Sequence, residues 1–326
     1  MRAPAMFYEL YGRIIDSDTP LAGLDVCPAR KADVRIRHMP ARGHANEDGR
    51  LIFESEQSHE DGSVVARLSQ TDSSYWWSFG DIVSFRVSRD GSLIEWFQEG
   101  GEARDLATLL AGSVAGFALQ LRGLVGLHGN GLTRDGAAFG LLGPSGYGKS
   151  SLSAALMNTG CEFLTDDLLA VEMDSGIPMA LSGQQRLKLW PDALEKLLPN
   201  DRGTQTYVSW LLKQCIAPSA LGARGSEARP LKALFILIPI AAEETPMVQP
   251  VHGERALIAL VANSYQAHLL IGEPELVAQR LDFLQALVRE TPVFALGCPR
   301  SFERLPMTAE LVISQLRLEQ RVVASR

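Results

Sequence analysis

Short apolar runs, separated by polar turn sequences, fill the first hundred positions of the chain. The runs cover residues 7–10, 34–37, 51–54, 64–68, 82–87 and 93–97. Asp-Gly pairs lie between them at 48–49, 61–62 and 90–91, and Asp-Gly is favoured in tight β-hairpin turns. The pattern predicts a small, mostly antiparallel β domain over residues 1–103. Its aromatic cluster of Tyr75, Trp76 and Trp77 is explained by core packing or, alternatively, by peptide capture.

A helical pattern begins at about residue 104. Between Asp105 and Arg122 the apolar side chains recur every three or four residues, as in an amphipathic helix that packs on a core. They are Leu106, Leu109, Leu110, Val114, Phe117 and Leu121. The uncharged run is too short to cross a bilayer, which takes ~20 residues. We therefore place this helix at the start of a second domain, residues 104–326.

The second domain has the pattern of an α/β fold. Nearly continuous apolar runs predict strands at residues 124–127, 137–142, 161–164 and 233–238, and such runs are typical of sheets covered on both faces. Helical spacing predicts helices at 151–157, 191–198, 256–270 and 274–288. Gly160 suits the C-terminal cap of the first of these helices.

Composition and charge narrow the class of protein. Of the 326 residues 46% are hydrophobic and 21% are charged, which is ordinary for a globular protein and excludes disordered and collagen-like chains. The formal charge of -7 provides no global field for nucleic acid or anionic membranes, so neither is expected as a partner. Four widely spaced cysteines predict reduced thiols, and no export signal is evident, which together indicate a cytoplasmic protein.

The strongest chemical signal is a glycine-rich segment between a predicted strand and a predicted helix. Residues 143–150 read Gly-Pro-Ser-Gly-Tyr-Gly-Lys-Ser, which fits the P-loop pattern, and the strand before it and the helix after it favour this reading over a chance glycine-rich turn. Glycines let backbone amides turn inward onto phosphate oxygens, and the helix N-terminus adds its dipole. The predicted phosphate-binding residues are Gly143, Ser145, Gly146, Tyr147, Gly148, Lys149, Ser150 and Ser151.

Three further residues are candidates for the chemistry of a bound triphosphate. Asp166 and Asp167 follow a predicted strand, so one could serve Mg²⁺ with the Ser150 hydroxyl while the other accepts a proton. The alternative is that they cap a helix beginning at Leu168. His128 ends a predicted strand and could steady charge on the γ-phosphate, or be a structural histidine before a turn at 129–131.

Two basic segments are weaker candidates. Arg186 and Lys188 alternate, so on a strand they would share one face and could hold a phosphate or an acidic peptide, or simply face solvent. Arg224 and Arg229 lie in a segment rich in glycine and alanine, residues 221–229, which is either a loop that closes over the nucleotide or a plain linker.

The order of these motifs resembles the catalytic domain of the HPr kinase/phosphorylases over residues 120–175. In that family a His-Gly pair precedes the P-loop and an Asp-Asp pair follows its helix, as at 128–129 and 166–167 here, although Pro144 stands where the family has an aspartate. The resemblance implies a fold like that of phosphoenolpyruvate carboxykinase, with ATP and Mg²⁺ as cofactors and transfer of phosphate to a protein serine. By position, Asp167 matches the catalytic base, Asp166 lies near the metal with Ser150, and His128 matches the active-site histidine.

The whole chain also resembles HPr-kinase-related proteins encoded with ribosomal peptide natural products, especially lasso peptides. The shared features are Tyr11-Gly12, Pro20-Leu21, the helix before the P-loop and the segment at 186–192. This resemblance implies a serine of a precursor peptide as acceptor, and HPr enzymes assemble as hexamers, so a homo-oligomer stays open. A nucleotide-gated peptide-binding protein and a small-molecule kinase are the alternatives, because a fold does not fix the acceptor.

Overall fold

A computed structural model describes residues 5–40, 49–55, 64–80, 82–98, 103–184, 186–197, 205–206, 213–216 and 227–324. They form two compact units. The first is built from Met1–Leu124 and Gln266–Leu276, and the second from Val125–Thr206, Lys213–Tyr265 and Val277–Arg326. In the described part of the chain no helix is both long and apolar enough to span a membrane. Cys27, Cys161, Cys215 and Cys298 are all free thiols, as predicted.

The first unit contains one nine-stranded sheet. Its strands are β1 (Met6–Leu10), β2 (Arg13–Ser17), β3 (Val26–Cys27), β4 (Val34–Met39), β5 (Arg50–Glu54), β6 (Arg67–Gln70), β7 (Ser74–Phe79), β8 (Val83–Ser88) and β9 (Leu93–Gln98). They are ordered β3-β1-β2-β4-β9-β8-β7-β6-β5. Only the β2–β4 and β4–β9 pairs are parallel among these described strands, so the sheet is mostly antiparallel, as predicted. The predicted turn at 90–91 joins β8 to β9, where Gly91 has a φ of +68°.

A broken helix packs within this first unit. It comprises α1 (Ala103–Leu109), a π-helical turn η1 (Leu110–Val114) and α2 (Ala115–Leu121), and the predicted apolar stripe is buried. The Phe117 ring meets Tyr75 and Trp77 of β7 edge-on, with centroids 5.1 and 5.9 Å apart. This packing explains why the helix, which the sequence analysis placed in the second domain, belongs to the first unit. It also makes the aromatic cluster a core feature.

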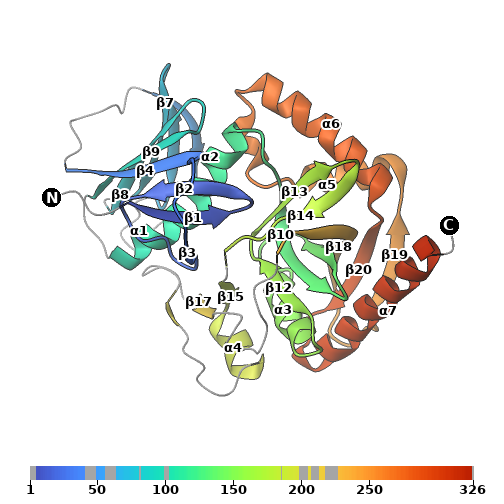
Figure 1. The fold of residues 1–326 in the computed structure, drawn as a ribbon. Coiled ribbons are helices and arrows are strands. Elements are labelled where there is room, and N and C mark those ends of the chain that lie inside the picture. The colour runs from blue at the N-terminus through green and yellow to red at the C-terminus, as the bar shows by residue number, and fades with distance from the viewer. Residues whose placement is uncertain are drawn as a thin grey trace. The chain divides into compact units, whose positions relative to one another are not determined.

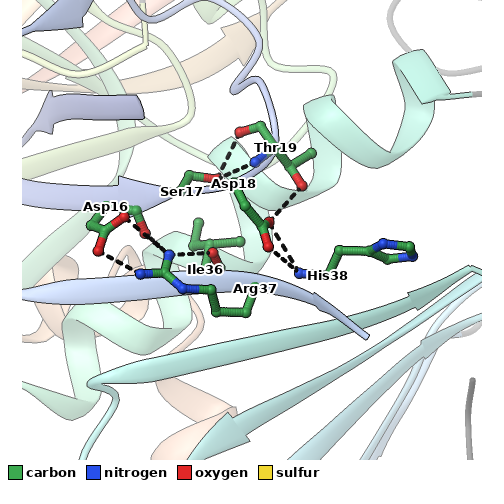
Figure 2. A network of polar contacts seen from close by, with 7 residues as sticks. All are labelled: Asp16, Ser17, Asp18, Thr19, Ile36, Arg37 and His38. Atoms are coloured by element: carbon green, nitrogen blue, oxygen red, sulfur yellow. Dashed lines mark hydrogen bonds and ion pairs between the residues drawn. The ribbon is translucent and has the colours of Figure 1, made fainter. Parts of the chain in front are cut away.

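Polar side chains tie together the parallel strands β2 and β4 (Figure 2). The Arg37 guanidinium donates to the Asp16 carboxylate at 3.0 Å and to its backbone carbonyl at 2.9 Å. The carboxylate of Asp18 accepts the backbone N–H of His38 at 2.9 Å. Asp16 is buried, so these charge-assisted bonds hold the strand pair in register.

The second unit is built around an eight-stranded mixed sheet. Its strands are β10 (Val125–Arg134), β11 (Ala137–Leu142), β12 (Glu162–Thr165), β13 (Leu168–Asp174), β14 (Ile177–Ala180), β18 (Arg229–Ile240), β19 (Met247–Val251) and β20 (Val293–Pro299). The order is β11-β10-β13-β14-β18-β20-β19, with β12 paired to β10 and β11 paired parallel to β18. A small separate sheet has the order β15-β17-β16, from Leu187–Leu189, Gln214–Ile216 and Gln205–Thr206.

Helices cover both faces of the larger sheet, giving a three-layer α/β unit (Figure 1). On one face, α3 (Lys149–Met157) and α7 (Leu305–Ala324) share a core with Phe139, Leu141 and Phe235. On the other face, α5 (Gly253–Ala262) and α6 (Pro274–Glu290) pack against a cluster that includes Ala138 and Leu142. Neighbouring residues of β11 therefore alternate between the two cores, as the apolar run predicted. The other described helices are α4 (Pro191–Leu197) and η4 (Phe302–Arg304), while η3 (Ala267–Leu270) belongs to the first unit.

Two of the alternatives and one prediction for this unit are wrong. The turn considered at 129–131 is part of β10. Gly129 allows β10 and β11 to lie close together, since a Cβ there would lie 2.5 Å from the Leu141 carbonyl oxygen. The element beginning at Leu168 is a strand, so the aspartates before it cap no helix. The predicted helix at 256–270 is interrupted after α5, because Ser264 pairs with Leu127 of β10.

The weaker basic segments are only partly described. Lys188 lies in β15 and Arg186 immediately precedes that strand, and both half-buried residues alternate with the buried Leu187 and Leu189. Arg229 opens β18 and lies 3.5 Å from the Glu227 carboxylate. Arg224, with most of the predicted loop at 221–229, lies outside the described residues.

Candidate functional site

The glycine-rich segment connects β11 to α3, which is the predicted position of a phosphate-binding loop. Gly143, Gly146 and Gly148 have φ values of +145°, +84° and +92°, in the region that side chains other than glycine rarely adopt. Gly148 immediately precedes α3, whose first residue is Lys149. The loop therefore presents backbone amides at a helix N-terminus, an arrangement suited to binding anions.

The side chain of Lys149 is folded back into its own loop. Its ammonium donates to the carbonyls of Gly143 at 2.5 Å and Pro144 at 3.0 Å, and its Nζ lies 3.2 Å from Nε2 of His128. The residue is 8% exposed, and burial lowers the pKa of Lys149 to about 8. Burial of a cation is costly unless it has hydrogen-bond partners, and the two carbonyls and His128 provide them here. The ammonium is therefore held at the wall of the cavity.

The two aspartates occupy a tight turn between β12 and β13. The N–H of Leu168 donates to the Asp166 carbonyl at 2.9 Å, which closes a three-residue turn around Asp167. Asp167 has a φ of +73°, as in a γ-turn with positive central φ, a rare and strained conformation for a residue with a side chain. Strain of this kind is typical of functional sites, because the surrounding structure has to hold it.

The turn gives the two carboxylates different environments. Asp166 is 6% exposed and accepts the backbone N–H of Lys188 at 2.8 Å, and burial raises the pKa of its carboxyl. Asp167 keeps 38% of its side chain exposed, with Oδ2 3.0 Å from Nζ of Lys188. Partial burial acts to raise the pKa of Asp167, but the ammonium of Lys188 outweighs it and holds the pKa well below its usual range. Asp167 is therefore the ionised, accessible carboxylate of the pair.

His128 lies between the lysine of the loop and the accessible aspartate. Its Nδ1 is 3.7 Å from Oδ1 of Asp167, on the other side of the ring from Lys149. The backbone N–H donates to the Asn263 carbonyl at 2.6 Å, and the imidazole stacks on Tyr265 with centroids 6.2 Å apart. Burial lowers the pKa of His128, which favours its neutral form at pH 7.

Two residues at the site were missed by the sequence analysis in their actual roles. Lys188 was predicted to hold a phosphate or an acidic peptide, or to face solvent, whereas it contacts both aspartates, one through its backbone and one through its ammonium. Asn130 is fully buried; its amide donates to the Ser153 hydroxyl at 3.0 Å and its oxygen lies 3.5 Å from the backbone nitrogen of Asp167. The only signal for Asn130 was a polar residue between two glycines in an apolar segment.

These residues surround one cavity of about 300 Å³. Of the predicted site residues, Ser145, Gly146, Tyr147, Gly148, Lys149, Ser150, Ser151, His128, Asp166 and Asp167 line it. Gly143 contributes through its carbonyl contact with Lys149. The lining also contains Lys188, Lys213 and Arg300, which with Lys149 make four cations against the three carboxylates of Asp166, Asp167 and Asp192. A chain of net negative charge thus has a locally basic cavity, as a polyanion site requires.

The oxygen donors at the site suit Mg²⁺ in the presence of phosphate. Within the described ranges no three His, Cys, Asp or Glu residues group closely enough to hold a metal by themselves. Mg²⁺ prefers oxygen ligands and is commonly bound by one or two carboxylates together with substrate phosphates and water. Ser150 and Asp166, which both line the cavity, are donors of this kind.

No protein-family model matches this sequence, and no curated protein matches it. Among solved structures the chain is similar to that of the Hpr(Ser) kinase/phosphatase from Coxiella burnetii, at 14% sequence identity and a TM-score of 0.33. The similarity covers 60% of this chain and 98% of that chain. The function is therefore inferred from the site itself.

Proposed function

We propose that this protein is an ATP- and Mg²⁺-dependent kinase that phosphorylates a serine hydroxyl of a peptide or small protein. The observation that carries the proposal is the grouping of a loop lysine, a histidine and an ionised aspartate on one cavity. His128 lies 3.2 Å from Lys149 and 3.7 Å from Asp167, so a phosphate held by the loop would be close to a proton acceptor.

The glycine-rich loop and the basic lining would bind the triphosphate. Backbone amides at 146–150 and the ammonium of Lys149 favour the negative charge of the β- and γ-phosphates. Ser150 and Asp166 would hold Mg²⁺, which neutralises charge on the phosphate oxygens when it is bound. The additional cations Lys188, Lys213 and Arg300 favour a polyanion over a neutral ligand.

Asp167 is the residue that would accept the proton of the attacking hydroxyl. In the transfer, the hydroxyl oxygen forms a bond to the γ-phosphorus, the bond from that phosphorus to the β–γ bridging oxygen breaks, and ADP leaves with the electron pair. The hydroxyl proton goes to the carboxylate of Asp167, which is ionised and accessible, whereas Asp166 is buried. Neutral His128 accepts a hydrogen bond from the Lys149 ammonium through Nε2 and faces Asp167 with Nδ1, so it would support the γ-phosphate by positioning these two groups beside it.

The proposed acceptor of the phosphate is a serine hydroxyl of a peptide. A serine is the acceptor that the resemblance to HPr kinase/phosphorylases implies, and a lasso-peptide precursor is the acceptor that the likeness to cluster-encoded relatives implies. The basic cavity lining is compatible with an acidic segment next to the target serine. The resemblance leaves a homo-oligomer open.

Calorimetry and peptide phosphorylation together test this function. We expect the wild-type chain to bind ATP in magnesium buffer and to phosphorylate members of a degenerate serine peptide library, detected by mass spectrometry. Lys149→Ala should lose ATP binding, because a buried cation facing the phosphates is removed. A control library with alanine in place of serine should gain no phosphate.

The outcomes separate the candidate functions. ATP binding without transfer to any hydroxyl would support a nucleotide-gated binding protein instead of a kinase. Transfer to small alcohols and not to peptides would support a small-molecule kinase. Absence of ATP binding by the wild-type chain would contradict the proposal as a whole.

A further inference from the structure

The cavity extends from the phosphate loop to an aromatic residue that the phosphotransfer chemistry leaves without a role. Trp190 lines the cavity together with the loop, and it is 42% exposed, whereas Trp76, Trp77 and Trp96 are buried. It lies directly between β15 and α4. An exposed aromatic surface inside a concave site is a common feature of ligand recognition.

The backbone on both sides of Trp190 is anchored in the core. Leu189 and Ala193 are buried in the same hydrophobic cluster as the apolar residues of α3, and the Trp190 carbonyl accepts the N–H of Leu194 at 2.9 Å in the first turn of α4. Because α3 begins with Lys149, this core fixes the backbone of Trp190 relative to the phosphate-binding loop. The indole is therefore attached to a fixed point of the cavity wall.

The surroundings of the ring combine a positive charge with apolar surface. The ammonium of Lys213 lies 5.1 Å from the centre of the indole, within the range of a cation–π interaction. Phe302 of η4 and Leu305, the first residue of α7, also line this cavity. A nucleotide carries the complementary pair of chemistries, an aromatic base joined to anionic phosphates.

We propose that the indole of Trp190 is the stacking surface for the nucleobase of the bound triphosphate, with Lys213 as the adjacent cation. The inference rests on the proposed function, since it requires a nucleoside triphosphate on the phosphate loop. The base stacks through its π-face, so Trp190 contributes affinity and contributes little to the choice between bases. It makes no contact with the transferred phosphate.

Tripolyphosphate and ATP, compared by calorimetry, test this inference. We expect the wild-type chain to bind ATP more tightly than inorganic tripolyphosphate, which lacks the base. Trp190→Ala should lose about tenfold in ATP affinity, the effect of removing one base–aromatic stack, while its affinity for tripolyphosphate stays unchanged. Trp190→Phe, which keeps an aromatic surface, should stay within about threefold of the wild type for both ligands.

Tryptophan fluorescence provides a second readout that does not depend on the alanine variant. ATP should quench the emission of the wild-type chain and of Trp96→Phe, a control in the first unit, but not that of Trp190→Phe. Equal ATP affinity in Trp190→Ala and wild type would overturn the inference, as would an equal loss for both ligands. Tripolyphosphate binding as tight as that of ATP overturns this inference alone, whereas binding of neither ligand overturns the proposed kinase as well.

Discussion

Two aspartates, one in each compact unit, form similar ion pairs in very different settings. Asp16 lies in a strand and is buried, and the Arg37 guanidinium bonds both its carboxylate and its carbonyl (Figure 2). Asp167 lies in a strained turn, and it keeps 38% of its side chain exposed while one ammonium contacts it at 3.0 Å. In the first pair the guanidinium bonds both carboxylate oxygens, whereas the second leaves part of the carboxylate facing a cavity.

The cations differ in the same way. Arg37 presents a planar fork that fixes the geometry of its partner, whereas Lys188 presents a single point charge on a flexible stem. A fork suits a pair that only has to hold two strands together. A point charge suits a carboxylate that has to be oriented and still be free to accept a proton from a third group.

The comparison predicts that asparagine lowers a different quantity at each position, phosphotransfer at Asp167 and stability at Asp16. Asp167→Asn should lower phosphotransfer by about 10²–10⁴-fold, since the amide cannot accept the proton, while ATP affinity stays close to that of the wild type. Asp16→Asn should leave transfer intact and lower the free energy of unfolding by about 1–2 kcal/mol, because the amide N–H groups face the Arg37 donors. Transfer assays, calorimetry and urea unfolding measure these quantities.

Each variant serves as the control for the other. Normal turnover in Asp167→Asn would remove this carboxylate from the mechanism. A comparable loss of turnover in Asp16→Asn at full folding would show that the distinction between a structural and a functional pair is wrong.

Replacing the cation of each pair, Lys188 or Arg37, tests the same comparison, and we expect a smaller loss of transfer than in Asp167→Asn. Lys188→Met should lower transfer by about 10–100-fold, because the Asp167 carboxylate loses the ammonium that orients it, while the backbone bond to Asp166 remains. Lys188→Arg restores the charge and should recover part of kcat. Arg37→Met should reduce stability by about 1–2 kcal/mol with kcat unchanged.

A failure of Lys188→Arg to improve on Lys188→Met would contradict a positioning role for the charge. Thermal unfolding of both variants provides the control for folding. A reduction of kcat in Arg37→Met would contradict a purely structural role for the Asp16–Arg37 pair.

The parts of the site that follow from local sequence were predictable. A loop that needs three positive φ values has to contain glycines, and a lysine at the start of the next helix follows from the same pattern, so Lys149 was identified directly. The strand at 137–142 was predicted because its residues have to fill two cores. Asp166 and Asp167 were identified as chemical groups by their place after a strand.

The remaining features depend on contacts between distant segments. The φ of Asp167 is fixed by its turn between two strands and not by its own preference, so the sequence left a helix cap open there as the alternative. Lys188 contacts Asp167 although the two residues are 21 positions apart in the chain. No sequence motif surrounds Lys188, so the sequence does not identify Asp167 as its partner. The helix at 103–121 was assigned to the wrong side of the boundary because its apolar stripe does not specify which core it joins.

The strain at Asp167 allows a final comparison in which only stability is measured. Asp167→Gly and Asp167→Ala both remove the carboxylate and its contact with Lys188, so they differ only in backbone preference. A non-glycine residue at this φ is strained by about 1–3 kcal/mol, and the extra freedom of glycine in the unfolded chain offsets about 1 kcal/mol of the relief. Asp167→Gly should therefore have the larger free energy of unfolding, by about 1 kcal/mol in urea titrations.

At Asp16, which lies in the regular strand β2, the sign should reverse, with Asp16→Ala more stable than Asp16→Gly by about 0.5–1 kcal/mol. The same sign at both positions would mean that the turn stores no strain, and that the accessible carboxylate is held by its ion pair alone.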